Sequence, residues 1–71
     1  MSWNRYIKRG AIEATEWTID TDMTLVSLSA DDIENGNPKS GGMIARDPKN
    51  PNDRWYINPD YFNKHYRKED E

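Results

Sequence analysis

"RWYINPDYFNKHY", from Arg54 to Tyr66, holds five of the eight Phe, Trp and Tyr residues of the chain within thirteen positions. Its opening "RWYI" is rich in aromatic and β-branched residues and predicts a strand. Asn58 is a good N-cap, and Pro59 suits the first helical position because an N–H there would lack a partner anyway. The stretch therefore predicts a strand that leads directly into a C-terminal helix.

Alternation along the strand and the four-residue spacing along the helix divide these side chains between a core and a surface. Those that share a buried face are predicted to form the core: Trp55, Ile57, Phe62 and Tyr66. The others are predicted to lie outside it: Arg54, Tyr56, Tyr61 and His65. The sequence thus indicates that one half of the cluster supports the fold and the other half is free to bind a partner.

Upstream of this stretch, "GGMIAR" (41–46) and "RWYIN" (54–58) are short apolar runs. The proline-containing "DPKNPND" (47–53) separates them and predicts a hairpin with a long tip. "AIEATEWTI" (11–19) predicts another strand, in which a bulge near Thr15 or Glu16 would explain why the apolar face changes side.

The middle of the chain gives weaker signals. "MTLVSLS" (23–29) fits either a buried strand or one side of a short helix, and we favour the strand. "SADDIENG" (29–36) predicts a short helix that Ser29 caps and Gly36 ends.

Length and composition favour one small domain. The chain has 71 residues, 34% of them hydrophobic, a mean hydropathy of −1.16 and no Cys. It is too short for a second core, and it cannot form a disulfide. We predict a small α+β fold, an antiparallel sheet of three or four strands that can curl like a barrel, with the C-terminal helix packed on it. Residues 1–10 would form a basic N-terminal arm, 11–67 the globular domain and 68–71 a frayed acidic tail.

No residue pattern points to catalysis, a metal or a cofactor. His65 is the single His, and no sequence pattern pairs it with a nucleophilic Cys or Ser. Adjacent acids such as Asp31 and Asp32 are typical of helix N-termini. The 47–53 segment lacks the acid spacing of a calcium loop. A signal peptide and a membrane span are also absent from the pattern, which favours a cytoplasmic protein. We therefore expect a non-enzymatic protein without cofactors and without a membrane partner.

Charge is segregated along the chain, although its net value is only −3. The blocks either neutralise one another across strand pairs or leave an acidic face that binds a basic partner or mimics nucleic acid. The residues of that candidate face are Asp20, Asp22, Asp31, Asp32 and Glu34. Eight large rings also exceed what so small a core buries easily, so a second candidate surface combines aromatic and basic residues. Its predicted members are Trp3, Tyr6, Arg54, Tyr56, Tyr61 and His65.

The strings "KRGAIEATEWT", "GGMIAR" and "RWYINPDYFNKHY" together resemble small proteins of tailed phages and prophages. Those proteins pair an "IEA-x-QW" opening with a "GD-W-I" turn and a terminal "F-x-x-x-Y" helix. Here Glu16 replaces the usual Gln, and Met43 follows Gly42 where the pattern has Asp. The resemblance implies a phage source and a small β-rich fold, and it supplies no catalytic residue.

The expected function is that of a phage accessory protein in the host bacterial cytoplasm, which binds a host or defence protein and modulates it, with inhibition as the expected effect. Two alternatives stay open. One is a phage accessory protein that binds nucleic acid through its basic and aromatic residues. The other is a small virion or assembly component, for which homo-oligomerisation would be expected.

Overall fold

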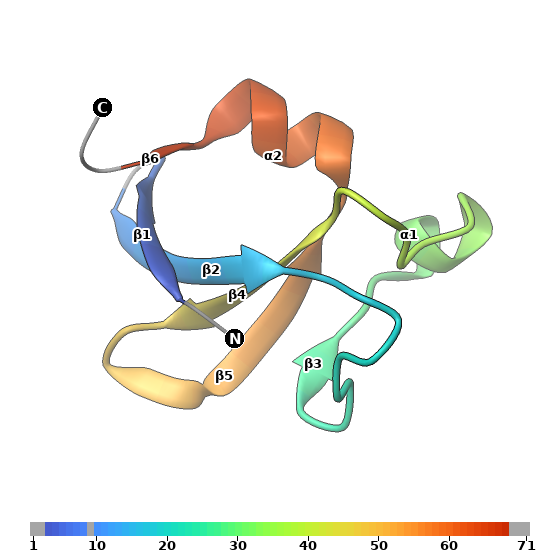
Figure 1. The fold of residues 1–71 in the computed structure, drawn as a ribbon, viewed down its shortest axis with the longest axis horizontal. Coiled ribbons are helices and arrows are strands. Elements are labelled where there is room, and N and C mark those ends of the chain that lie inside the picture. Colours follow the sequence, from blue (N-terminus) through green and yellow to red (C-terminus); the bar gives the residue numbers. More distant parts are fainter. Residues whose placement is uncertain (1–2, 9, 69–71) are drawn as a thin grey trace.

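The computed structural model describes residues 3–8 and 10–68, which form one mixed sheet and two short helices (Figure 1). The strands are β1 (Asn4–Ile7), β2 (Ala11–Glu16), β3 (Val26–Ser27), β4 (Met43–Asp47), β5 (Asn50–Ile57) and β6 (Arg67–Lys68). The helices are α1 (Ala30–Glu34) and α2 (Pro59–His65). The protein is therefore a small α+β fold.

The sheet has six strands in the order β3-β5-β4-β2-β1-β6. Every neighbouring pair is antiparallel except β3 and β5, which run parallel. The prediction of three or four antiparallel strands is therefore too low and misses the parallel pair. The reason is that β3 and β6 have only two residues each and form by pairing with distant strands, which leaves no local pattern.

Both predicted chain ends contribute to this sheet. Asn4–Ile7, within the predicted basic arm, is β1 and pairs along its whole length with β2. Lys68, assigned to the frayed tail, belongs to β6 and lies opposite Tyr6 of β1. The fold thus extends beyond 11–67 at both ends. The remainder of the predicted tail, 69–71, lies outside the described residues.

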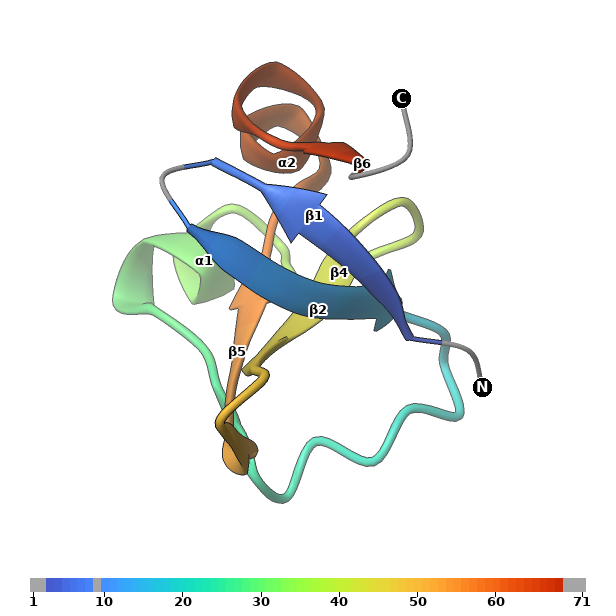
Figure 2. The same ribbon diagram turned by 90° about the vertical axis from the view of Figure 1, so that its left-hand side faces the viewer.

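The inner face of the curled sheet carries the main core, and α2 lies across it (Figure 2). Ala14 of β2 and Ala45 of β4 lie opposite each other and are fully buried, so that large side chains can approach the sheet closely. The buried cluster comprises Ala14, Met43, Ala45, Ile57 and Phe62, with Tyr6, Ile12, Trp55 and Tyr66 packed against it. The four predicted core residues of the C-terminal stretch are all among them.

Local capping explains where both helices begin. The Asn58 side chain accepts a hydrogen bond from the Tyr61 backbone N–H at 2.8 Å, and Pro59 is the first residue of α2. The Ser29 hydroxyl likewise accepts from the Asp32 backbone N–H at 3.1 Å and caps α1. Both predicted helix starts are confirmed.

The strand predictions around the sheet need three corrections. The β4–β5 hairpin has a short tip, because β5 begins at Asn50, opposite Asp47, and only two residues lie between the strands. The irregularity in pairing lies at Arg46/Asp47 of β4, whereas β2 pairs regularly through Glu16. Within 23–29 only Val26–Ser27 forms a strand. The apolar face of 11–19 changes side because β2 ends at Glu16, before Trp17.

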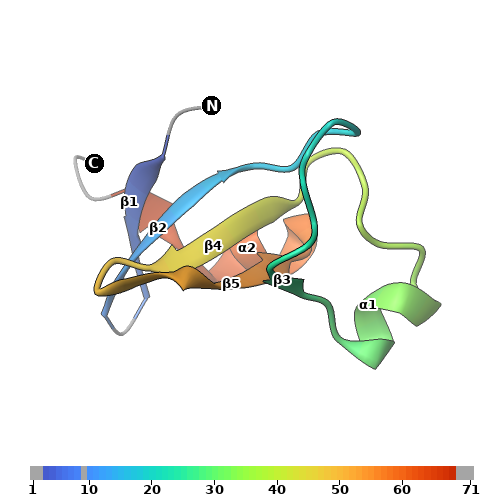
Figure 3. The ribbon, with the colours of Figure 1, turned by 90° about the horizontal axis from the view of Figure 1, so that it is seen from below.

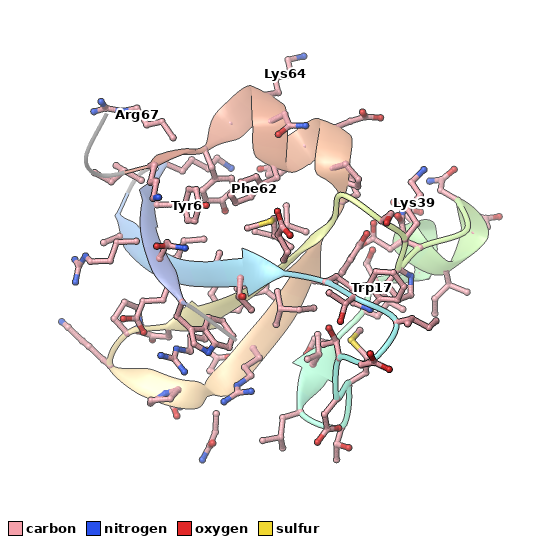
Figure 4. All side chains as sticks on the ribbon, viewed as in Figure 1. Tyr6, Trp17, Lys39, Phe62, Lys64 and Arg67 are labelled. Atoms are coloured by element: carbon pink, nitrogen blue, oxygen red, sulfur yellow. The ribbon has the colours of Figure 1, made fainter. Side chains whose placement is uncertain are left out.

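Residues 17–42 leave the sheet after β2, rejoin its edge briefly as β3 beside β5, continue through α1 and return to β4. Figure 3 shows this excursion standing on the side of the sheet opposite β1, with α1 near its outer end. The Trp17 side chain projects into this region of the molecule (Figure 4). Of the four large apolar side chains that are exposed among the described residues, three belong to this excursion.

Candidate functional site

The six predicted partner-binding residues do not form one surface. Two of them pack in the interior, two lie on the outer face of the sheet and two lie on α2. The groups are Tyr6 and Tyr56, then Trp3 and Arg54, then Tyr61 and His65. Each group has a different capacity to bind a partner.

Tyr56 is the clearest correction, since only 5% of it is exposed. Its hydroxyl donates to Asn37 Oδ1 at 3.1 Å and accepts from the Lys39 backbone N–H at 3.2 Å. Burial, reinforced by the nearby Asp32 carboxylate and opposed by the Lys39 hydrogen bond, raises the pKa of the Tyr56 hydroxyl. Tyr56 does point away from Trp55, as predicted, but the returning chain at 37–42 covers it.

Gly42 makes this covering possible. A Cβ atom at Gly42 would lie 2.5 Å from both Cε1 and Cζ of Tyr56, a distance that real Cβ atoms do not adopt. Ile44 and Thr15 occupy the strand positions beside Tyr56 and are also buried. The outer face of the sheet therefore has a small second core at the end where the excursion returns.

Tyr6 packs in the main core instead of presenting its ring to solvent. Its ring meets that of Phe62 edge-on at a centroid distance of 4.8 Å, and Figure 4 shows the two side chains together beneath α2. The correction follows from the strand: in β1, Tyr6 lies opposite Ile12 and so shares the inner face. Tyr6 is thus a structural residue.

Trp3 and Arg54 do come together, and Arg46 of β4 also contacts the Trp3 ring. The Arg46 guanidinium carbon lies 4.0 Å from the centroid of the Trp3 ring, and that of Arg54 lies 5.3 Å from it. Arg46 Nε also donates to Glu13 at 2.9 Å, and Arg54 Nε donates to the Pro51 carbonyl at 2.7 Å. Both guanidinium groups are therefore already engaged within the fold, which reduces what they can offer a nucleic acid.

Tyr61 and His65 form an exposed aromatic corner on α2, with ring centroids 4.3 Å apart. Lys8 Nζ donates to the Tyr61 hydroxyl, and it lies 4.7 Å from the centroid of the Tyr61 ring and 6.0 Å from that of Tyr66. Burial raises the pKa of the Tyr66 hydroxyl; Lys8 opposes this shift and Tyr61 adds to it. Both side chains are exposed to solvent, so they lie outside the core as predicted.

A groove that the sequence did not reveal opens beside this corner. It has a volume of about 510 Å³ and is lined by Lys8, Gly10, Ala11, Ile12, Asp47, Pro48, Asp53, Trp55 and Tyr66. Strand alternation from Trp55 places Asp53 on the inner face, so part of this lining was foreseeable. The approach of the β1–β2 turn to the β4–β5 tip was not, because it depends on how far the sheet curls.

The acidic segment, residues 17–37, is the second candidate surface. It contains all five predicted acidic-face residues and no Lys, Arg or His. Among the described residues four large apolar side chains are exposed, and three of them belong to this segment: Ile19 at 85%, Leu25 at 54% and Ile33 at 62%. The acidic segment thus combines negative charge with apolar side chains that have no cover in the fold.

Short hydrogen bonds hold parts of the acidic segment in shape. The Asp22 carboxylate accepts from the Thr24 hydroxyl at 2.6 Å and from the Thr24 backbone N–H at 2.9 Å. These bonds keep the pKa of Asp22 below its usual value, with the hydroxyl contributing most. Asp32 accepts from the Ser29 hydroxyl at 2.9 Å. The negative charges are therefore held on defined turns, although they remain exposed to solvent.

In the part of the chain that the structure covers, no three acidic, His or Cys side chains gather to hold a metal ion. Neither α1 nor α2 has the length and apolar character of a membrane-crossing helix, and no other helix occurs within 3–8 and 10–68. Comparison of the chain with protein-family models, curated proteins and solved structures finds no match.

Proposed function

We propose that this chain is a non-enzymatic binding protein whose acidic segment docks on a basic, partly apolar surface of another protein. The observation that carries this proposal is the concentration of Ile19, Leu25 and Ile33, all exposed, in a segment that has five acids and no base. Single exposed apolar residues are ordinary, but this density within one short excursion is not.

The two features have complementary roles in binding. Full burial of an exposed Ile or Leu side chain contributes about 1.5–3 kcal/mol. Burial of these three side chains would therefore supply a large part of the free energy that offsets the cost of association. Negative charge accelerates encounter with a basic partner and selects against acidic ones. In the setting that the phage resemblance implies, the partner is a host or defence protein that this protein modulates.

An affinity-capture experiment tests the proposal. The wild-type chain and an Ile19→Ser/Leu25→Ser/Ile33→Ser variant are immobilised separately and exposed to the same bacterial lysate. A Lys64→Ser variant serves as the matched surface control, since Lys64 is exposed on α2. We expect the wild type and the control to retain the same basic protein, identified by mass spectrometry, and the triple variant to lose it.

Two results would contradict the proposal. One is that the folded wild type captures nothing above background. The other is that the triple variant captures the same proteins as the wild type while its circular dichroism spectrum is unchanged. Either would mean that the exposed apolar side chains of the acidic segment do not make the interface.

Nucleic-acid binding is the second candidate, and the stacking of Arg46 and Arg54 on Trp3 favours it. Phosphate contacts release counterions, so such binding would weaken steeply as salt rises. Fluorescence anisotropy of a labelled single-stranded oligonucleotide between 50 and 200 mM salt, roughly the range over which such complexes dissociate, distinguishes this candidate. The pairing of Arg46 with Glu13 and the acidic pI of about 5.0 make it the weaker one.

A further inference from the structure

A second hollow lies beside α2 and has lining residues in common with the groove between the β1–β2 turn and the β4–β5 tip. The second hollow has a volume of about 290 Å³, and it shares Trp55 and Tyr66 with the groove. Its other lining residues are Asp32, Tyr56, Ile57, Asn58 and Tyr61. Trp55 and Tyr66 thus form an aromatic floor that the two hollows share.

Acidic groups lie at both ends of this floor. Asp47 and Asp53 line the end at the hairpin tip, and Asp32 lines the end at α1. Asp47 accepts the Lys49 backbone N–H at 2.9 Å, whereas Asp53 forms no hydrogen bond or ion pair within residues 3–8 and 10–68. Asp32 already accepts from the Ser29 hydroxyl and from the Asn37 side-chain amide. The two carboxylates at the hairpin tip therefore keep most of their capacity to accept hydrogen bonds from a ligand.

Lys8 is the one basic side chain in the described lining, and it already contacts neighbouring aromatic residues. Lys8 donates to the Tyr61 hydroxyl and lies over the rings of Tyr61 and Tyr66. The Lys8 ammonium group is thus held at the rings of Tyr61 and Tyr66. The described lining therefore has a net negative charge, and its floor is aromatic.

We infer that this groove seats an arginine side chain of the partner protein. This inference rests on the proposed function, because it concerns the same basic partner. A guanidinium group is planar and weakly hydrated, so it stacks on indole and phenol rings while its N–H fork donates to carboxylates. A lysine ammonium group is compact and strongly hydrated, and it matches a flat aromatic floor less well.

The inference is tested with small probes on the full chain. N-acetyl-arginine amide is titrated into isotope-labelled protein, and NMR follows the indole N–H signal of Trp55. N-acetyl-citrulline amide has the same shape without the charge, and N-acetyl-lysine amide has the charge without the plane. We expect saturable shifts of Trp55 with the arginine probe and at least about 3- to 5-fold weaker binding of the other two. The citrulline probe loses the charge pair with the carboxylates, and the lysine probe loses the planar group that stacks on the rings.

Removing an acidic or a basic side chain from the groove should change the affinity for the arginine probe in opposite directions. Asp53→Asn should weaken arginine binding about 3- to 5-fold, and Lys8→Gln should strengthen it by a similar factor because it removes a repelling charge. Asp60→Asn is the matched control: Asp60 is exposed on α2 and does not line the groove. It should leave the affinity unchanged.

Three outcomes overturn the inference: no Trp55 shift with the arginine probe, equal binding of the citrulline or lysine probe, or weaker binding after Lys8→Gln. Failure of the groove is distinguishable from failure of the acidic segment. The Ile19→Ser/Leu25→Ser/Ile33→Ser variant should still bind the arginine probe with wild-type affinity. Conversely, the Asp53→Asn variant should still retain some partner protein in affinity capture, because its acidic segment is unchanged.

Discussion

Replacing Gly42 with Ala should destabilise the protein, although a Gly-to-Ala change is usually stabilising. Gly42 does not have a positive φ, so its backbone conformation is open to Ala. Such a change ordinarily raises the free energy of unfolding by about 0.4–1 kcal/mol, because it lowers the conformational entropy of the unfolded chain. At Gly42, however, the new methyl group would overlap the hydroxyl end of the Tyr56 side chain.

The size of the effect follows from the packing and the hydrogen bonds that Tyr56 would lose. Overpacking a buried site costs about 1–3 kcal/mol. Displacing the ring also strains the hydrogen bonds to Asn37 and to the Lys39 backbone, each of which contributes roughly 0.5–1.5 kcal/mol. After the gain from the unfolded state is subtracted, we expect a net loss of about 2–4 kcal/mol. The total free energy of unfolding of a chain of this size is only about 4–10 kcal/mol.

Urea unfolding followed by circular dichroism measures this loss. Gly10→Ala is the matched control, because Gly10 also lacks a positive φ and a Cβ there meets nothing within 4 Å. The control should be as stable as the wild type or slightly more stable. In a Tyr56→Leu background, Gly42→Ala should cost less than about 1 kcal/mol, since the clash is relieved. Equal stability of the two Ala variants, or an unchanged loss in the Leu background, would refute the account of the outer face.

Three further predictions concern the core, the helix cap and pH. Phe62→Ala should lose about 3–5 kcal/mol in urea unfolding, because Phe62 joins α2 to the sheet, whereas Tyr61→Ala should lose less than about 1 kcal/mol; the reverse order would invalidate the core assignment. Ser29→Ala should cost α1 about 1 kcal/mol and speed amide exchange there about 5-fold, and unchanged exchange would show that the cap is not needed. Burial raises the pKa of Tyr56, so the fold favours its neutral form: stability is fully present below the unfolded pKa of about 10 and falls as pH rises through the folded value. Alkaline unfolding titrations should therefore show a shallower decline for Tyr56→Phe, and an identical decline would contradict the pKa shift.

The parts of the fold that sequence analysis predicted are those fixed by neighbouring residues. Asn58 and Pro59 determine the start of α2 through bonds within one helical turn, and Ser29 does the same for α1. Strand alternation correctly separated Trp55 from Tyr56. These features depend on backbone geometry within a few positions, so they can be read directly from the chain.

The parts that were missed depend on segments far apart in sequence. Alternation placed Tyr56 on the outer face of its strand, but it could not show that residues 37–42 return across that face. Tyr6 was assigned to a basic arm because the first ten residues carry three bases and no acid, yet pairing with β2 brings it to the core. The groove likewise requires the β1–β2 turn and the β4–β5 tip to meet, and only the curl of the complete sheet decides this.

The central claim is that the acidic segment is the docking surface, and an amide chemical-shift map tests it most directly. A basic amphipathic peptide of alternating Lys and Leu is added to the isotope-labelled full chain at physiological salt. We predict that the largest shifts fall within residues 18–36 and disappear in the Ile19→Ser/Leu25→Ser/Ile33→Ser variant. Shifts that instead centre on Trp3, Arg46 and Arg54, or that persist unchanged in the triple variant, would contradict the claim.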